Sequence, residues 1–265
     1  MTGSWESILV AEGISKNYAQ VRALSSLSFS IQPGERVALA GPSGSGKSTL
    51  LYLMAGILQP DAGQLYIDNH RLAHLQPGRE LSRLVGIIHQ QYDLVPHLPV
   101  IHNVLAGRLG QWSLFRSLVS LVWPQDRQLA ESALAKLGIA NKAYQRTSHL
   151  SGGEQQRVAI ARVMVQSPTV VLADEPVASL DPARAEEMLR LLTDLTTSAG
   201  KTLIVSLHSP YLIQKYCSRV IGLRQGRMFF DLPASGVTEA VLGRLYDLNH
   251  NPPEELVPEV FSAIS

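Results

Sequence analysis

The sequence of 265 residues contains a single cysteine, almost no excess of charge, and no apolar run long enough to span a bilayer, which takes about 20 residues. Cys217 alone excludes an internal disulfide framework and metal sites built on several cysteines, and it favours a reducing compartment. The net charge of +1 is dispersed and therefore predicts no nucleic-acid surface. Any work at a membrane would need a different chain to cross it.

The chain also lacks internal repeats and a recognisable targeting signal. Its first 13 residues include acidic side chains and no basic region ahead of a long apolar core, so we expect no signal peptide. With 45% apolar residues, the chain can bury one large core, or one core with a subdomain.

A glycine-rich stretch joins an apolar run with strand character at 36–40 to a helix start near residue 50. Its glycines allow the backbone N–H groups to point inward, and the helix dipole favours negative charge at the same place. Lys47 offers a cation to outer phosphates, and the Ser48 hydroxyl is placed to ligate Mg²⁺. A plain glycine-rich turn is the alternative, although the flanking strand and helix are the context that a phosphate-binding motif requires. The predicted phosphate loop comprises Gly41, Pro42, Ser43, Gly44, Ser45, Gly46, Lys47, Ser48 and Thr49.

The rest of the chain alternates between two patterns. Short strands are predicted at 8–15 and 23–31, with Tyr18 between them where we expect the chain to turn. Residues from about 90 to 150 show helical spacing, whereas strands return at 170–173 and 201–206. A helical segment is therefore predicted to interrupt an α/β core. Tyr18 is either a half-buried loop aromatic or a stacking face for a nucleobase.

Two acids, Asp174 and Glu175, follow the apolar run 170–173, which is typical of a strand buried on both faces of a parallel sheet. An Asp at such a strand end is placed to hold Mg²⁺ beside a phosphate loop. Glu175 would then face the γ-phosphate as a base or positioner for an attacking water, the alternative being two solvated carboxylates. His208, after the strand 201–206, is either a hydrogen-bonded structural group or a neutral donor to phosphate.

A second anion-binding site, called the second anion seat below, is predicted at Leu150–Gln155, where a serine and two glycines precede a helix. One nucleotide does not need two such seats from one chain. The second seat therefore serves a nucleotide held by another copy, which predicts a head-to-tail homodimer that clamps two ATP molecules. An ordinary capped helix start is the alternative. The residues of this seat are Ser151, Gly152, Gly153 and Glu154.

With these motifs in this order, the chain resembles the ATP-binding cassette (ABC) ATPases along nearly its whole length. The resemblance implies an α/β fold, namely a P-loop NTPase (RecA-like) core with an inserted helical subdomain and an N-terminal antiparallel β subdomain. One domain would then span 1–265. Its nucleotide-binding core would cover 1–89 and 160–235, its helical signature subdomain 90–159, and its short C-terminal tail 236–265.

The resemblance also implies roles for single residues. Tyr18 would stack on adenine, and the loop 179–181 would cross to the other subunit, with Asp181 at its nucleotide. Gln90 would join Mg²⁺ and signal to a transport partner. Because His89 stands where relatives usually have an aromatic residue, Gln91 is the alternative for this role. The implied catalytic residues are Glu175, His208, Lys47 and Gln90, and the implied Mg²⁺ ligands are Ser48, Gln90 and Asp174.

The segment Trp112–Trp123 is strongly apolar. It either packs internally or forms a docking surface for a membrane protein, and we favour docking because exposed apolar patches usually mark interfaces. With the preceding 103–110 and the late helix near 238–246, it resembles the phosphonate-importer branch of the family. On helical spacing, one stripe comprises Trp112, Phe115, Val119 and Val122, and another comprises Leu114, Leu118 and Leu121.

That branch implies ATP-driven uptake of phosphonates or related phosphorus oxyanions such as phosphite. The implied partners are a second copy of the chain, transmembrane permease subunits and, indirectly, a periplasmic or extracellular solute-binding protein. The chain would lie peripherally on the cytoplasmic face of the plasma (inner) membrane. Transport of another substrate is the alternative. A soluble ABC protein of translation or repair would need a second cassette or a long coiled coil, and a P-loop kinase or GTPase has no use for the second anion seat.

Overall fold

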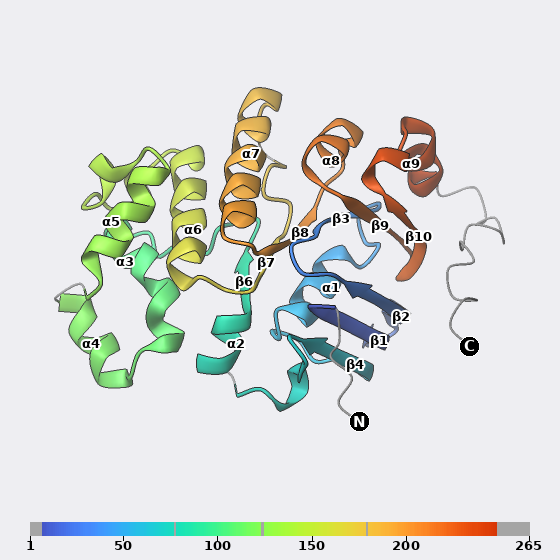
Figure 1. Cartoon of the computed structure of the whole chain (residues 1–265), viewed down its shortest axis with the longest axis horizontal. Coiled ribbons are helices and arrows are strands. Elements are labelled where there is room, and N and C mark those ends of the chain that lie inside the picture. Colours follow the sequence, from blue (N-terminus) through green and yellow to red (C-terminus); the bar gives the residue numbers. More distant parts are fainter. Residues whose placement is uncertain (1–6, 77, 123–124, 179, 248–265) are drawn as a thin grey trace.

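The computed structural model describes residues 7–76, 78–122, 125–178 and 180–247. Its strands form two sheets (Figure 1). The smaller sheet is antiparallel, with the order β2 (Val21–Ile31), β1 (Leu9–Tyr18), β4 (Ala62–Ile67), β5 (His70–Arg71). The larger sheet has the order β10 (Arg227–Pro233), β9 (Arg219–Arg224), β3 (Arg36–Ala40), β8 (Thr202–Ser206), β7 (Val170–Ala173), β6 (Val85–Ile88). All pairs in the larger sheet are parallel except β10 with β9.

Helices cover this larger sheet and fill the segment between β6 and β7. Short 3₁₀ turns at Leu72–His74, Ala106–Gln111, Ala140–Lys142, Thr147–His149 and Ala234–Gly236 connect the elements. Within the described residues, no helix combines the length and apolarity that a membrane crossing requires. The helices are α1 (Lys47–Met54), α2 (Arg79–Leu84), α3 (Val100–Leu105), α4 (Leu114–Val122), α5 (Arg127–Lys136), α6 (Gly152–Gln166), α7 (Pro182–Ser198), α8 (Pro210–Tyr216) and α9 (Glu239–Tyr246).

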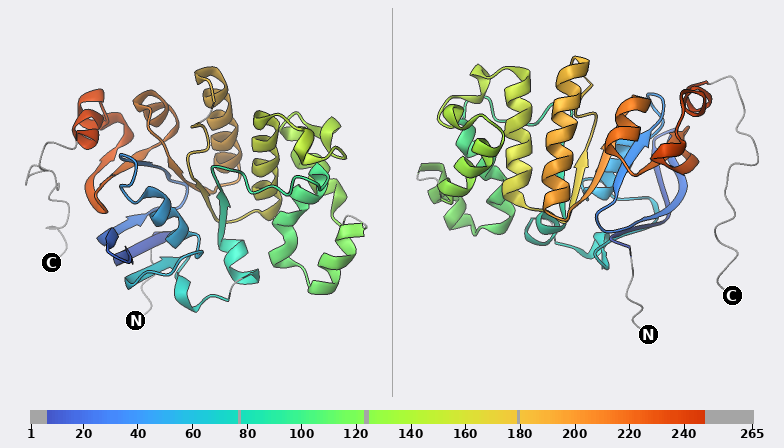
Figure 2. Two further views of the ribbon diagram at one scale, coloured as in Figure 1. Left: turned by 180° about the vertical axis from the view of Figure 1, so that it is seen from behind. Right: turned by 45° about the horizontal axis from the view of Figure 1, so that its top comes forward.

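The two faces of the larger sheet bury two different apolar clusters. Alternate residues of one strand divide between them, as Leu39 packs toward the small sheet and α1 while Ala38 packs toward α6, α7 and α8. Figures 1 and 2 show the small sheet and α1 on one side of the larger sheet and α6 to α8 on the other. Because both faces are covered, the central strands are continuous apolar runs rather than alternating ones. The structure thus confirms the predicted α/β core with an antiparallel β portion.

The helical stretch between β6 and β7 also agrees with the sequence pattern, while the turn expected at Tyr18 begins one residue later. The strand β1 continues through Tyr18, which pairs with Val21, so the chain turns after Tyr18 rather than at it. In the apolar segment, Trp112 is half-buried against the core cluster, whereas Phe115 is 79% exposed. Trp123 and the side chains of Leu114, Leu118, Leu121 and Val122 lie outside the described part of the chain.

The loop that follows Gln90 is held in place by one buried and one half-buried polar side chain. Asn103 of α3 accepts a hydrogen bond from the Val95 amide (2.7 Å) and donates to the Val95 carbonyl (3.1 Å) and to Thr147 Oγ1 (2.8 Å). Arg162 of α6 donates to the carbonyls of residues 92 and 93, at 2.8 Å each. Burial lowers the pKa of the Arg162 guanidinium, which Asp93 partly opposes. The loop is therefore attached to α3 and α6.

Asn103→Ala should lower the free energy of unfolding by about 2–4 kcal/mol, because it removes several hydrogen bonds and leaves the Val95 amide without its acceptor. Hydrogen exchange at the Val95 amide should accelerate in parallel. Asn141→Ala, at an exposed position of the same helical segment, is the matched control and should change neither quantity. Equal stability of the two variants would contradict the assignment of Asn103 as the anchor of this loop.

Candidate functional site

The carboxyl ends of β3, β8, β7 and β6 lie side by side because these strands are parallel neighbours. The glycine-rich loop follows β3, Asp174 follows β7, and Gln90 and His208 lie two residues beyond the ends of β6 and β8. Backbone hydrogen bonds tie these ends together, from the Asp174 amide to Ile88 and from the Leu207 amide to Leu39. Residues from four distant segments are thereby placed at one edge of the sheet.

The loop itself needs glycine where its backbone is left-handed or tightly surrounded. Gly46 has φ +103°, and a Cβ there would lie 2.6 Å from the Ala23 carbonyl oxygen. A Cβ at Gly41 would lie 2.1 Å from the Leu223 carbonyl oxygen. The buried Ser45 hydroxyl has no hydrogen-bond partner among the described residues. Ser43, Gly44 and Ser48 are exposed, and Pro42, Gly46 and Thr49 are half-buried.

Lys47, the first residue of α1, is the buried cation of this loop. Its Nζ donates to the carbonyls of Gly41 (2.9 Å) and Pro42 (3.2 Å). Burial lowers the pKa of the ammonium group, and attraction to the Glu175 and Asp174 carboxylates partly opposes that shift. An ammonium group that is desolvated and satisfied only by loop carbonyls is well suited to an incoming anion. The unpartnered Ser45 hydroxyl and the exposed loop beside Lys47 fit the same kind of ligand.

The Glu175 carboxylate is contacted by two side chains that the sequence placed in the same site. His208 Nε2 lies 2.9 Å from Oε1, and Gln90 Nε2 donates to Oε2 at 3.4 Å. Glu175 also has φ +45°, a conformation that non-glycine residues rarely adopt and that functional sites often retain. Both glutamines considered for this position are exposed, and Gln90 is the one whose side chain reaches Glu175.

Ser206 is a site residue that the sequence analysis missed. Its hydroxyl, buried at the end of β8, donates to Asp174 Oδ1 (3.0 Å) and accepts from the Glu175 amide (2.6 Å). It therefore holds the two acids in their relative positions. A serine that ends an apolar strand beside a predicted site was the only signal available, and it carries no indication of its partner.

Tyr246, at the end of α9, also enters the site. Its hydroxyl lies 2.9 Å from His208 Nδ1, on the side of the imidazole opposite Glu175. Sequence reasoning used this tyrosine only to mark a helix end. The contact joins residues 38 positions apart, so no local motif could have revealed it.

Metal ligands at this edge would come from mixed residue types. No group of three or more His, Cys, Asp or Glu side chains in the described ranges could hold a metal ion. Asp174 is buried at the strand end and Ser48 is exposed at the start of α1. Mg²⁺ is commonly held by one or two carboxylates together with water and substrate phosphates. A hydroxyl, an amide and one carboxylate beside a phosphate loop fit that pattern.

The second predicted anion seat lies at the start of α6 and forms a capping box. The Ser151 amide donates to Glu154 Oε2 (2.8 Å), and the Glu154 amide donates to Ser151 Oγ (3.4 Å). Hydrogen bonds from the Ser151 amide and hydroxyl lower the pKa of Glu154. Nothing lies within 4 Å of a Cβ built at Gly152 or Gly153, so the helix start is open. Within the described part of one chain, no hydrogen bond joins these residues to the phosphate loop.

The remaining predicted residues lie on exposed surface. Tyr18 is 45% exposed at the end of β1, with Lys16 Nζ 6.0 Å from its ring centroid, so its ring is free to stack. Asp181 caps α7 by accepting from the Arg184 amide (3.1 Å). Leu180 and Arg184 line the same surface hollow as Ser151. Ser179 lies outside the described residues.

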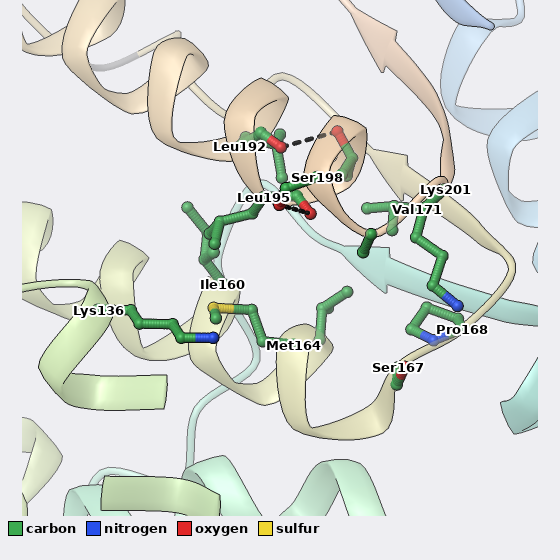
Figure 3. A pocket seen from close by; sticks show the side chains of 13 residues that line it. Lys136, Ile160, Met164, Ser167, Pro168, Val171, Leu192, Leu195, Ser198 and Lys201 are labelled. Atoms are coloured by element: carbon green, nitrogen blue, oxygen red, sulfur yellow. Dashed lines mark hydrogen bonds between the residues drawn. The ribbon is translucent and has the colours of Figure 1, made fainter. Parts of the chain in front are cut away.

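A separate cavity of about 200 Å³ lies among the ends of α6 and α7 and the start of β7 (Figure 3). It is lined mainly by apolar side chains such as Ile160, Met164 and Leu192. None of its lining residues belongs to the predicted site, which lies at the opposite, carboxyl-terminal edge of the strands. We therefore assign the chemistry to the loop edge rather than to this cavity.

Comparisons with known proteins agree with this geometry. The sequence model of the family described as "ABC transporter" matches residues 24–178. The chain is 45% identical over 236 residues to the phosphonates import ATP-binding protein PhnC of Pseudomonas putida, covering 88% of each chain. It is 46% identical to the PhnC 1 protein of Pseudomonas aeruginosa, covering 85% of each.

Solved structures show the same fold. CbiO1 of Clostridium perfringens, part of the ABC transporter complex cbiONQ, has a TM-score of 0.75 and 30% identity over 91% of this chain and 94% of its own. The ATP-binding cassette MJ0796, solved as a dimer after hydrolysis with ADP and phosphate bound, has a TM-score of 0.75 and 29% identity over 86% of this chain and all of its own.

Ser206→Ala should lower the free energy of unfolding by about 2–4 kcal/mol, because the buried Asp174 carboxylate loses a donor and the Glu175 amide loses its acceptor. Urea unfolding gives the measurement. Ser198→Ala removes an exposed hydroxyl that donates only to the Leu195 carbonyl and should stay within about 0.5 kcal/mol of the parent chain. A Ser206→Ala protein as stable as this control would disprove the bridging role.

Proposed function

Since the chain belongs to the ABC transporter family, we propose that it is the ATP-hydrolysing subunit of an importer for phosphonates or a related phosphorus oxyanion such as phosphite. The single observation that carries the ATPase assignment is the Glu175 carboxylate, held by His208 and Gln90 at the strand edge that bears the phosphate loop. The choice of substrate is supported by the PhnC relatives, which are named for phosphonate import and match over most of both chains.

The nucleotide phosphates are assigned to the loop 41–49. Inward backbone amides and the N-terminus of α1 favour negative charge there, and Lys47 exchanges its loop carbonyls for phosphate oxygens. Mg²⁺ is assigned to Ser48, Gln90 and Asp174, and it would neutralise charge on the phosphates. The exposed Tyr18 ring is assigned to stacking on the adenine.

Hydrolysis is assigned to Glu175 as the residue that orients water and accepts its proton. In the structure, His208 and Gln90 contact this carboxylate. On the proposed role, His208 Nε2 instead donates to the γ-phosphate, where it stabilises charge that builds up in the transition state. Glu175 is then released to act on water.

A second copy of the chain is needed to complete each site. Ser151, Gly152 and Gly153 form an open helix start that, among the described residues, has no hydrogen bond to the phosphate loop of its own chain, so we assign it to the nucleotide of the partner copy. Glu154 holds Ser151 in position for this contact, and Asp181 lies on the same surface. The MJ0796 cassette, which resembles this chain over 86% of its length, was solved as a dimer.

Coupling to a permease is assigned to the segment between β6 and α6. We propose the subdivision into a nucleotide-binding core at 1–89 and 160–235, a helical subdomain at 90–159 and a C-terminal tail at 236–265. The exposed Phe115 in α4 is the described part of the docking surface, whereas Trp112 supports it from within. Such a subunit would lie on the cytoplasmic face of the inner membrane and depend on a solute-binding protein outside.

Glu175→Gln should reduce steady-state ATP hydrolysis by about 100-fold or more, because the residue that accepts the proton of water is lost while the nucleotide contacts remain. With ATP and Mg²⁺, sedimentation should then show a stable dimer. Glu12→Gln, on the exposed face of β1, is the matched control and should hydrolyse ATP normally.

Adding Ser151→Arg to the Glu175→Gln chain should abolish that ATP-induced dimer, because a large side chain occupies the seat offered to the partner's nucleotide. A Glu175→Gln chain with full turnover, or a Ser151→Arg double variant that still dimerises, would contradict the proposed mechanism.

Deleting the gene should abolish uptake of one class in a panel of phosphonates, phosphite and phosphate, and the wild-type gene should restore it. Complementation with Phe115→Ser should fail although the purified variant hydrolyses ATP at the basal rate. Ile57→Ser, which alters an exposed apolar side chain outside the helical segment, should complement fully. Unchanged uptake of every phosphorus compound after deletion would refute the substrate assignment and leave the ATPase assignment standing.

A further inference from the structure

The contact between Tyr246 and His208 has no role in the mechanism derived above. The Tyr246 hydroxyl lies 2.9 Å from His208 Nδ1, and the two ring centroids are 6.2 Å apart. One side chain of the C-terminal helix therefore touches the histidine of the predicted site.

The donors and acceptors in this chain of contacts can be placed by elimination. His208 Nε2 is 2.9 Å from Glu175 Oε1, a carboxylate oxygen that can only accept, so Nε2 carries the ring proton. Nδ1 of the neutral imidazole then carries no proton and accepts from the Tyr246 hydroxyl. The hydrogen positions are thus assigned from the network.

Tyr246 is held in place without help from the site. Leu242 and Leu245 of α9 are buried in the core, and Thr238 caps the helix by accepting from the Val241 amide (3.3 Å). At the other end of α9, the buried Arg224 donates to the Arg244 carbonyl (3.3 Å). Burial also raises the pKa of the Tyr246 phenol, so its hydroxyl keeps its proton well above neutral pH. The donor to Nδ1 is therefore held by the packing of α9 against the core.

We propose that Tyr246 is a positioning residue for His208. Its hydroxyl occupies Nδ1 and so keeps the ring proton on Nε2, facing the edge where Glu175 lies and where the γ-phosphate is assigned. This inference rests on the proposed ATPase function for its catalytic consequence, but not for its structural content. Helix α9 then contributes to the site, because its Tyr246 determines which nitrogen of His208 can donate a hydrogen bond.

The structural content is tested by nitrogen NMR of ¹⁵N-histidine-labelled chain without nucleotide. In the wild type, His208 should show a protonated Nε2 and an Nδ1 that accepts a hydrogen bond. Tyr246→Phe should shift the Nδ1 resonance toward that of an acceptor without a donor, while the ring packing and unfolding temperature are nearly retained. Tyr211→Phe is the matched control, because among the described residues its hydroxyl hydrogen-bonds only Glu186 and Lys215, on the surface. His208 signals that are identical in all three proteins would overturn the proposal.

The catalytic consequence is tested by ATP kinetics on the same proteins. Loss of one hydrogen bond should reduce kcat by about three- to tenfold in Tyr246→Phe, with KM for ATP within about twofold, because His208 acts on charge in the transition state. Tyr211→Phe should keep both constants. If Tyr246→Phe showed the expected NMR shift but an unchanged kcat, the hydrogen bond between Tyr246 and His208 would have only a structural role. That result would contradict the positioning role. Absence of hydrolysis by the wild type would instead count against the ATPase function alone.

Discussion

The parallel pairing of β3, β8, β7 and β6 is the constraint on which the site depends. Each strand is buried on both faces and can carry no chemistry of its own, so functional side chains appear only where a strand ends. Parallel strands end at the same edge. Lys47, Gln90, Glu175 and His208 therefore come together from segments that span most of the chain, and backbone hydrogen bonds between the strand ends maintain their spacing.

At that edge, Asp174 and Glu175 accept hydrogen bonds from neighbouring side chains. The proposed mechanism assigns some of these same donors to the phosphates or the metal. Ser206 holds Asp174 and the Glu175 backbone permanently. His208 and Gln90, in contrast, hold the Glu175 carboxylate through side chains that can turn toward phosphate or metal. Lys47 is likewise a donor that a ligand could redirect, since the hydrogen bonds that the structure describes for its ammonium group go to loop carbonyls. On this view, the nucleotide enters by competing for donors that are already in place, which limits the reorganisation that binding requires.

The helix α6 connects this edge to the surface that the proposed function assigns to a second copy. It begins at the open seat of Ser151, Gln156 in its second turn donates to the Pro176 carbonyl next to Glu175, and Arg162 further along holds the loop after Gln90. A single rigid helix thus contacts the segments that bear the acid and the glutamine.

The sequence by itself determined the fold class and identified several of the side chains that the structure brings together at one strand edge. Glycine spacing, Lys47, the acids after an apolar strand and the second serine–glycine stretch are local patterns, each set by the chemistry of neighbouring residues. Tertiary structure decided the rest, because Ser206, Tyr246 and Asn103 acquire their roles only from partners distant along the chain. It also decided that Phe115 faces solvent while Trp112 packs inward, which a helical stripe alone does not distinguish. Local spacing specifies which groups one segment presents, and only the packing of segments specifies what those groups meet.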